Sequence, residues 1–192
     1  TKLQQFIRFC HSNNLEGIEY LFSVPATIGG AIFMNAGRGK QRNTQISDML
    51  LQVKIYDGKN VFELSKDQCH FSYRQSIFQS HRNWVILSAI FKLDVQDGLT
   101  GERQVQNRIE YIKKFQDHRF PSVGSVFKQG NPLIFTMLKG RRVGGAQFSN
   151  KTLNWINNLG NETAADVLNL IKMSKSWHSR LFMNCELEVE LW

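Results

Sequence analysis

The chain has 192 residues, of which 42% are hydrophobic and 21% charged, a balance that is ordinary for globular domains with a buried core. Its longest apolar run, VILSAIFKL, is about half the length that a membrane-spanning helix needs. The 24 lysines and arginines against 16 acidic residues give a net charge of +8, which favours anionic ligands. Only KGRR at 139–142 is a basic cluster, so the charge pattern disfavours a nucleic-acid groove and leaves a basic surface without any ligand as the alternative.

The cysteines and histidines show no metal-binding spacing, so we expect no metal site. The cysteines are scattered and odd in number, which predicts reduced thiols in a cytoplasmic compartment. The first residues, TKLQQFIRFC, predict a short amphipathic helix rather than a signal peptide. The residues concerned are Cys10, Cys69 and Cys185, with His11, His70, His81, His118 and His178.

The first half of the chain predicts one helix, one irregular segment and several strands. A helix is expected over 3–11, and residues 17–39 predict a close-packed loop with short helical turns, because a proline and several glycines interrupt the apolar sequence. Alternating residues on either side of Asp57-Gly58 predict a β-hairpin. Residues 84–95 predict another strand, mostly buried.

The second half predicts two helices and a final strand. Helical spacing of apolar residues occurs over 101–116 and again over 161–182, where Thr163 and Asp166 form a start similar to a capping box. The end, CELEVELW, alternates as a strand does, with Glu188 among the acidic residues on one side. Strands and helices without regular alternation predict an α+β fold. A boundary within 94–102 divides it into residues 1–97 and residues 98–192.

Three loop segments could carry chemistry. The glycines of VPATIGGAIFMNAG would allow a pyrophosphate or flat ring to approach the backbone, although they would also suit tight packing. HFSYRQSIF places Arg74, a potential carboxylate ligand, in a strand-to-turn context, where exposed arginines are also common. FPSVGSVFKQ holds the Ser125 hydroxyl in a constrained turn without the elbow motif of serine hydrolases. The acidic residues of ELEVE are either a solvated strand face or a source of one active-site carboxylate.

The order of these segments along the chain resembles that of UDP-N-acetylenolpyruvoylglucosamine reductases. These flavoenzymes use NADPH and FAD to make UDP-N-acetylmuramate for peptidoglycan, in the cytoplasm. The resemblance implies that residues 1–97 are part of an FAD-binding domain and residues 98–192 a smaller α+β substrate-binding domain with a C-terminal catalytic strand. It covers nearly the whole chain and is closest to the shorter subtype. The matching segments are GIEYLFSVPATIGGAIFMNAG, FSYRQSIF, PSVGSVFK, RVGGAQFSNKTLNWINNLGNETAADVLNLI and ELEVE.

The resemblance implies a role for individual residues of this chain. Ser125 would protonate the substrate carbon, Arg74 would stabilise the carboxylate and flavin region, and Glu188 would act on the intermediate. The substrate, UDP-N-acetylglucosamine enolpyruvate, would contact Tyr73, Lys128 and Asn158. The partners implied are this substrate and NADPH, with no nucleic acid and no membrane. FAD would be cradled by Pro25, Ala26, Thr27, Gly29, Gly30, Asn35 and Gly37.

Several departures from the family pattern accompany the resemblance. Family members open with a G-x-G-S-N phosphate loop for FAD, and we expect residues 1–192 to start after it. Ala26 replaces a usual glycine, and Phe115 aligns with an expected lysine. Thr152 stands where the family usually has histidine, and Phe182 where a glycine is typical. The alternative is therefore a non-catalytic fragment or descendant that binds a UDP-sugar without turnover.

Overall fold

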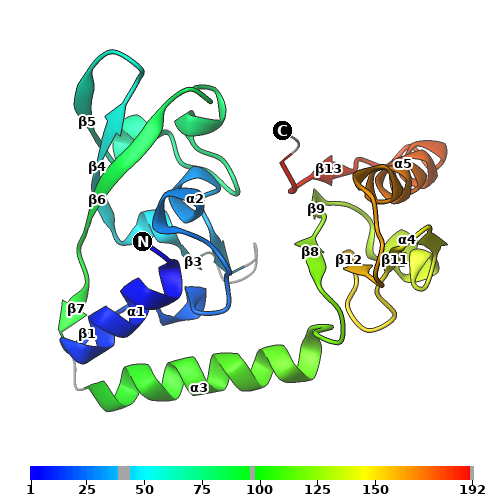
Figure 1. Cartoon of the computed structure of the whole chain (residues 1–192), viewed down its shortest axis with the longest axis horizontal. Coiled ribbons are helices and arrows are strands. Elements are labelled where there is room, and N and C mark those ends of the chain that lie inside the picture. The colour runs from blue at the N-terminus through cyan, green and yellow to red at the C-terminus, as the bar shows by residue number, and fades with distance from the viewer. Residues whose placement is uncertain (39–43, 96–97, 191–192) are drawn as a thin grey trace. The chain divides into compact units, whose positions relative to one another are not determined.

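The chain folds into two compact units that both mix helices with antiparallel strands. The structure, a computed structural model, describes residues 1–38, 44–95 and 98–190 (Figure 1). One unit comprises Thr1–Glu110 and the other Tyr111–Trp192. This architecture confirms the predicted α+β class. None of the described helices has the length and hydrophobicity to cross a membrane.

The first unit is built on a three-stranded sheet with the order β5-β4-β6 and on short helices packed against it. Two small antiparallel pairs, β1 with β7 and β2 with β3, complete its strands. Its elements are α1 (Leu3–Ser12), β1 (Leu15–Glu16), η1 (Glu19–Leu21), α2 (Ile28–Phe33), β2 (Gly37–Arg38), β3 (Thr44–Gln45), η2 (Ile46–Asp48), β4 (Leu50–Tyr56), β5 (Val61–Ser65), η3 (Asp67–Cys69), η4 (Ile77–Gln79), β6 (Val85–Phe91), β7 (Asp94–Val95) and the start of α3 (Gly98–Phe115).

Helix α1 confirms the predicted amphipathic helix at the start of the chain. Leu3, Ile7 and Cys10 recur at helical spacing and are buried in the core of the first unit. Burial raises the pKa of the Cys10 thiol to about 11, with Glu19 adding to the effect, so this cysteine stays protonated at neutral pH. The irregular segment that follows contains η1 and α2, as the glycine and proline pattern predicted.

The predicted hairpin is formed by β4 and β5. Tyr56 pairs with Val61 and closes the turn. The Asp57 side chain accepts hydrogen bonds from the backbone N–H groups of Lys59 and Asn60, at 2.8 and 2.7 Å. These contacts replace the hydrogen bonds that the turn cannot form within a strand ladder.

Strand β6 differs from its prediction, because the expectation that it is mostly buried is wrong. Val85, Leu87 and Ile90 are 53%, 51% and 53% exposed. The core of the first unit contacts this strand through Ile86, Ala89 and Phe91. An apolar run therefore does not require burial on both faces of an antiparallel sheet.

Helix α3 confirms the predicted helix over 101–116. Its first turns pack on the first unit through Val105, which is buried, and through a hydrogen bond from Arg108 Nε to Ser23 Oγ at 2.9 Å. The division between the units falls inside α3, after Glu110, whereas the sequence placed it at 97/98. The difference arises because the start of α3 buries apolar side chains in the first core.

The second unit contains a four-stranded sheet, a separate strand pair and two helices that share one core (Figure 1). The sheet order is β10-β11-β12-β8, and β13 pairs with β9. The core gathers apolar residues from α4, α5 and the strands, among them Val126, Ile134 and Leu170. Its elements are β8 (Ser122–Ser125), β9 (Phe127–Gln129), α4 (Pro132–Leu138), β10 (Arg142–Val143), β11 (Ala146–Phe148), β12 (Trp155–Asn158), α5 (Ala164–Arg180) and β13 (Glu186–Leu187).

Helix α5 begins as the sequence predicted. Thr163 Oγ1 accepts a hydrogen bond from Asp166 N at 3.2 Å, and the Asp166 carboxylate accepts one from Thr163 N at 3.0 Å. This reciprocal pair is a capping box with aspartate in the third position. Leu170 and Ile171, at 0% and 3% exposure, anchor the apolar face of the helix. The C-terminal strand is shorter than expected, since only Glu186–Leu187 pairs as a strand and residues 191–192 lie outside the described residues.

The cap of α5 gives a stability prediction. We expect Thr163→Ala to lower the free energy of unfolding by about 1 kcal/mol, because the N–H of Asp166 loses its side-chain acceptor. Urea unfolding followed by tryptophan fluorescence measures the change. Thr163→Asn, which keeps a capping oxygen, is the control and should retain most of the stability. Equal losses in the two variants would contradict a capping role.

Candidate active site

Ser125 lies where the chain passes from the surface into the core of the second unit. It is exposed and ends β8, where it pairs with Trp155 of β12. The next residues, Val126 and Phe127, are 0% and 3% exposed. Gly124 precedes it with φ +74°, a conformation that glycine adopts without steric cost. The hydroxyl is therefore presented to solvent by a backbone whose following residues are fixed in the core.

Glu188 is connected to Ser125 through the backbone of Val126. The N–H of Glu188 donates to the Val126 carbonyl at 2.8 Å, and the N–H of Val189 approaches the same oxygen at 3.4 Å. The backbone of Glu188 is thus hydrogen-bonded to the residue that follows Ser125, although the two predicted site residues are far apart in the chain. The carboxylate-bearing segment after β13 lies beside the serine turn.

The other predicted substrate contacts in this unit are Lys128, on β9, and Asn158, on β12. Lys128 Nζ forms an ion pair of 2.6 Å with Glu186, and only 14% of the lysine side chain is exposed. Because Glu186 is 54% exposed, we expect the pair to contribute at most about 1 kcal/mol of stability, and its main effect is to orient the lysine. Asn158 donates its backbone N–H to Pro121, at the start of the serine segment, and its side chain accepts from Gly160 N.

The glycine-bearing segment of the first unit has an open surface and a buried support. Pro25, Thr27 and Gly30 are exposed. Thr27 Oγ1 caps α2 by accepting a hydrogen bond from Gly30 N at 3.1 Å. Gly37 has no space for a side chain, because an added Cβ would collide with the backbone carbonyl of Thr44. Ala26 donates and accepts backbone hydrogen bonds with Val24 and Leu3, so this stretch is held close to α1.

Asn35, a predicted flavin ligand, is fully buried and its side-chain amide contacts the protein itself. Nδ2 donates to Gln45 Oε1 at 2.7 Å and to the Ser72 carbonyl at 2.8 Å. Oδ1 accepts from Ser47 N at 3.4 Å. These contacts connect the glycine-bearing segment to the loop that carries Arg74.

Arg74 contacts the same segment from the other side. Its Nη2 donates to the Gly37 carbonyl at 2.8 Å and Nη1 to the Asn35 carbonyl at 3.4 Å. Its guanidinium lies 5.0 Å from the centre of the Tyr73 ring, within cation–π range. The residue has φ +57°, and its carbonyl accepts a hydrogen bond from Gln79 Nε2 at 3.1 Å. These contacts fix the orientation of the guanidinium, whose planar donors can bind a carboxylate in a bidentate way.

The residues of the first unit are compatible with the flat ring of the FAD that the resemblance implies. An exposed backbone with few side chains can approach the ring edge, and Arg74 supplies a fixed cation beside it. Asn35 fits such a site as a support, because its amide is engaged inside the protein. Among the described residues, no group of His, Cys, Asp and Glu side chains is arranged to hold a metal ion. Arg74 belongs to the first unit and Ser125 with Glu188 to the second, so a common site for the three stays a prediction.

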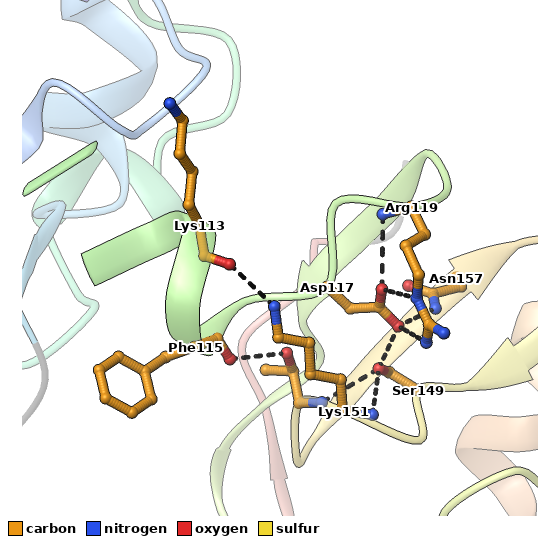
Figure 2. Close-up of polar contacts among 8 residues, drawn as sticks. Lys113, Phe115, Asp117, Arg119, Ser149, Lys151 and Asn157 are labelled. Carbon is orange, nitrogen blue, oxygen red and sulfur yellow. Dashed lines mark hydrogen bonds and ion pairs between the residues drawn. The ribbon is translucent and has the colours of Figure 1, made fainter. Parts of the chain in front are cut away.

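Sequence reasoning missed a buried carboxylate beside β12. Asp117 is 0% exposed and receives Arg119 Nε at 2.8 Å and Nη2 at 3.0 Å (Figure 2). Ser149 Oγ and Asn157 Nδ2 donate to the same carboxylate at 2.6 and 2.8 Å. These donors, the Arg119 guanidinium first, hold the pKa of Asp117 far below its ordinary value despite burial. The carboxylate therefore fixes Asn157, and with it the strand that pairs with β8.

The network extends from Asp117 to the end of α3. Ser149 Oγ accepts from the backbone N–H groups of Lys151 and Thr152, both at 3.1 Å. Thr152 Oγ1 donates to the Phe115 carbonyl. Lys151 Nζ donates to the Lys113 carbonyl, as Figure 2 shows. Thr152 and Phe115, which both depart from the family pattern in the sequence, thus contact each other. The only sequence signal was the spacing of two opposite charges, which does not distinguish a buried network from an exposed pair.

The Asp117 network gives a prediction for stability and pH. We expect Asp117→Asn to lower the free energy of unfolding by about 2 to 3 kcal/mol at pH 7, because hydrogen bonds to a charged group are lost. The folded pKa is depressed, so the contribution is complete above the unfolded pKa near 3.8 and decreases as the pH falls below it. Urea unfolding should therefore show the same difference between wild type and variant at pH 7 and pH 5, and a smaller difference at pH 3, where the unfolded carboxyl is mostly protonated and the folded one is still ionised.

Ser149→Ala is the matched variant for this network, since it keeps the carboxylate and removes the hydroxyl that donates to it and accepts from Lys151 N and Thr152 N. It should lower the free energy of unfolding by about 2 kcal/mol and retain the wild-type trend with pH. A difference between Asp117→Asn and wild type that is as large at pH 3 as at pH 7 would show that the carboxylate charge has no role.

Comparisons with known proteins agree with this arrangement. Residues 115–192 match the C-terminal domain of UDP-N-acetylenolpyruvoylglucosamine reductase. The protein of that name from Pseudothermotoga lettingae is 40% identical over 195 residues, which cover 94% of this chain and 65% of the relative. The one from Thermosipho melanesiensis is 33% identical and matches 99% of this chain and 67% of its own length.

A solved structure gives the same result for the fold. The crystal structure of UDP-N-acetylenolpyruvylglucosamine reductase from Thermus caldophilus aligns with a TM-score of 0.83 at 28% identity, covering 100% of this chain and 70% of that one. The chain thus spans between 53% and 67% of the length of the curated relatives it matches. The chain belongs to the UDP-N-acetylenolpyruvoylglucosamine reductase family, and its residues 115–192 are the C-terminal domain of that family.

Proposed function

We propose that this chain carries the substrate-reducing site of an FAD-dependent, NADPH-using UDP-N-acetylenolpyruvoylglucosamine reductase. The product would be UDP-N-acetylmuramate, a peptidoglycan precursor made in the cytoplasm. The observation that supports it most directly is the junction at Val126, which brings the Glu188 backbone beside the Ser125 turn. After hydride addition, completing the reduction of a double bond requires a positioned proton donor, and a neighbouring carboxyl group can assist it.

The first unit would hold the cofactor and the substrate carboxylate. FAD, when bound, supplies the hydride from NADPH to one carbon of the enolpyruvyl double bond. Pro25, Ala26, Thr27, Gly29 and Gly30 would contact it through backbone groups, with Asn35 and Gly37 supporting the segment.

Arg74 would stabilise negative charge on the substrate. Hydride addition to the double bond leaves an electron pair on the neighbouring carbon, which delocalises into the carboxylate as an enolate. A guanidinium already held by the Asn35 and Gly37 carbonyls needs little reorganisation to bind this charge. Its planar donors can form two parallel hydrogen bonds to a carboxylate, which the ammonium group of a lysine cannot do.

Ser125 would give its hydroxyl proton to the carbon that carries the electron pair. A serine hydroxyl is a weak acid in water, so the transfer needs a strongly basic carbanion and a site from which water is excluded. Glu188, on the adjacent backbone segment, would act beside the serine on the same intermediate. The nucleotide-sugar part would contact Tyr73, Lys128 and Asn158, and the net charge of +8 suits this substrate and NADPH.

The serine assignment gives the central functional prediction. In the full natural chain loaded with FAD, we expect Ser125→Ala to leave flavin reduction by NADPH unchanged. Flavin reoxidation by UDP-N-acetylglucosamine enolpyruvate should slow by on the order of 10²- to 10⁴-fold, the usual contribution of a general acid. Stopped-flow absorbance of the flavin measures both half-reactions separately.

Ser122→Ala is the matched control, because Ser122 is an exposed serine of the same strand. It should leave both half-reactions near the wild-type rates. If Ser125→Ala slows both half-reactions equally, the proton-donor assignment is wrong. A wild-type protein that binds the UDP-sugar but neither binds FAD nor turns over would favour the alternative, a binding protein without catalysis.

Glu188 gives a separate prediction for the same half-reaction. Glu188→Gln keeps the size of the side chain and the backbone hydrogen bond to Val126, and removes the carboxyl group. Flavin reoxidation by the substrate should slow by at least about 10²-fold, with flavin reduction by NADPH retained. Unchanged reoxidation would exclude Glu188 from the chemistry.

A further inference from the structure

Asn154 holds the two residues that follow Ser125 with three hydrogen bonds. Its side-chain Oδ1 accepts from the backbone N–H of Phe127 at 2.9 Å, and its Nδ2 donates to the Phe127 carbonyl at 2.6 Å. Its own backbone carbonyl accepts from the N–H of Val126 at 3.0 Å. The side-chain amide thus binds one residue through both a donor and an acceptor, as a neighbouring strand would.

The backbone conformation of Asn154 makes this contact available. Its φ is +58°, a left-handed conformation in which asparagine is more readily accommodated than most residues. The next residue, Trp155, begins β12 and pairs with Ser125. Strand β12 is held in turn by the hydrogen bond that Asn157 Nδ2 donates to Asp117. Asn154 therefore directly precedes a strand that is held in place next to Ser125.

Val126 connects Asn154 to Glu188 through its two backbone polar groups. The N–H of Val126 is bonded to Asn154, and its carbonyl to the N–H of Glu188 at 2.8 Å. Movement of Val126 would therefore change the direction of the Ser125 side chain and the position of the Glu188 backbone together. Small displacements of this kind are costly in catalysis, since a misplacement of about 1 Å can slow a reaction on the order of 10²-fold.

We propose that Asn154 is a positioning residue for the proton-transfer half of the reaction, acting through Val126 and Phe127 on Ser125 and Glu188. This inference rests on the function proposed above. The role needs a side chain with one donor and one acceptor, side by side, which an amide has. An ionised aspartate has acceptors only, and its second oxygen would face the Phe127 carbonyl. A protonated aspartate restores the donor.

Asn154→Asp tests this requirement through its pH dependence. Ionisation of the introduced carboxyl is opposed by the facing carbonyl, so its pKa should lie above the ordinary aspartate value. Below that pKa, flavin reoxidation by the substrate should be close to wild type. Above it, reoxidation should fall by on the order of 10- to 100-fold relative to wild type at the same pH, with flavin reduction by NADPH unchanged.

Asn161→Asp is the matched control, because Asn161 is an exposed asparagine with a similar left-handed φ of +56°. The rate of flavin reoxidation in this variant should stay close to that of wild type at every pH. Asn154→Gly is the second variant, since glycine keeps the backbone conformation and lacks the amide. It should slow flavin reoxidation without the pH dependence.

The outcomes separate this inference from the proposed function. If wild type reduces the enolpyruvyl substrate while Asn154→Asp and Asn154→Gly both match Asn161→Asp, the positioning role is wrong and the function stands. If wild type has no such activity, the proposed function fails, and the positioning role fails with it. A loss in Asn154→Asp that is the same at all pH values would contradict the donor requirement. If that variant does not fold, the half-reaction rates of Asn154→Gly decide.

Discussion

The structure of the second unit depends on how the backbone of Val126 is held. Its N–H is bonded to Asn154 and its carbonyl to Glu188, while its side chain is buried in the core. Backbone hydrogen bonds in a buried position are costly to break, because each broken bond leaves an unsatisfied polar group out of water. Ser125 precedes this peptide and is exposed. A reactive hydroxyl can thus face a ligand while its backbone stays rigid.

The first unit uses the same arrangement for Arg74. The side chain that would meet a ligand is only partly buried, and its immobility comes from the Gly37 and Asn35 carbonyls and from the support of Asn35 by Gln45 and Ser72. In both units the groups proposed for chemistry are attached to segments whose polar contacts are satisfied within the protein. Such preorganisation is the usual source of electrostatic stabilisation in enzymes, because little reorganisation is needed during the reaction.

The sequence predicted the features that depend on local chemistry. The capping box of α5, the amphipathic α1 and the hairpin at Asp57 follow from residues within a few positions of one another. Burial was harder, and β6 shows why: an apolar run does not reveal that only one face of a sheet is covered. The Asp117 network could not be predicted, because its donors Ser149 and Asn157 lie 32 and 40 residues away.

The candidate site was likewise predicted only in part. Ser125, Arg74 and Glu188 were predicted from the resemblance to family motifs, whereas the residues that hold them in place could not be predicted from the sequence. In the sequence, Asn154 does not differ from the other asparagines of the chain. The structure distinguishes it by its left-handed conformation together with its contact with Phe127, 27 residues earlier. Positioning residues act through geometry that spans distant segments, whereas reactive residues often sit in recognisable motifs.

A crystal structure of the full natural chain with FAD and the enolpyruvyl substrate bound would test the proposed site most directly. We expect the Arg74 guanidinium, the Ser125 hydroxyl and the Glu188 carboxyl all to surround the enolpyruvyl group next to the flavin ring. The guanidinium should lie within hydrogen-bond distance of the substrate carboxylate, and the hydroxyl should contact the carbon to be protonated. A complex in which any one of the three side chains points away from that group would contradict it.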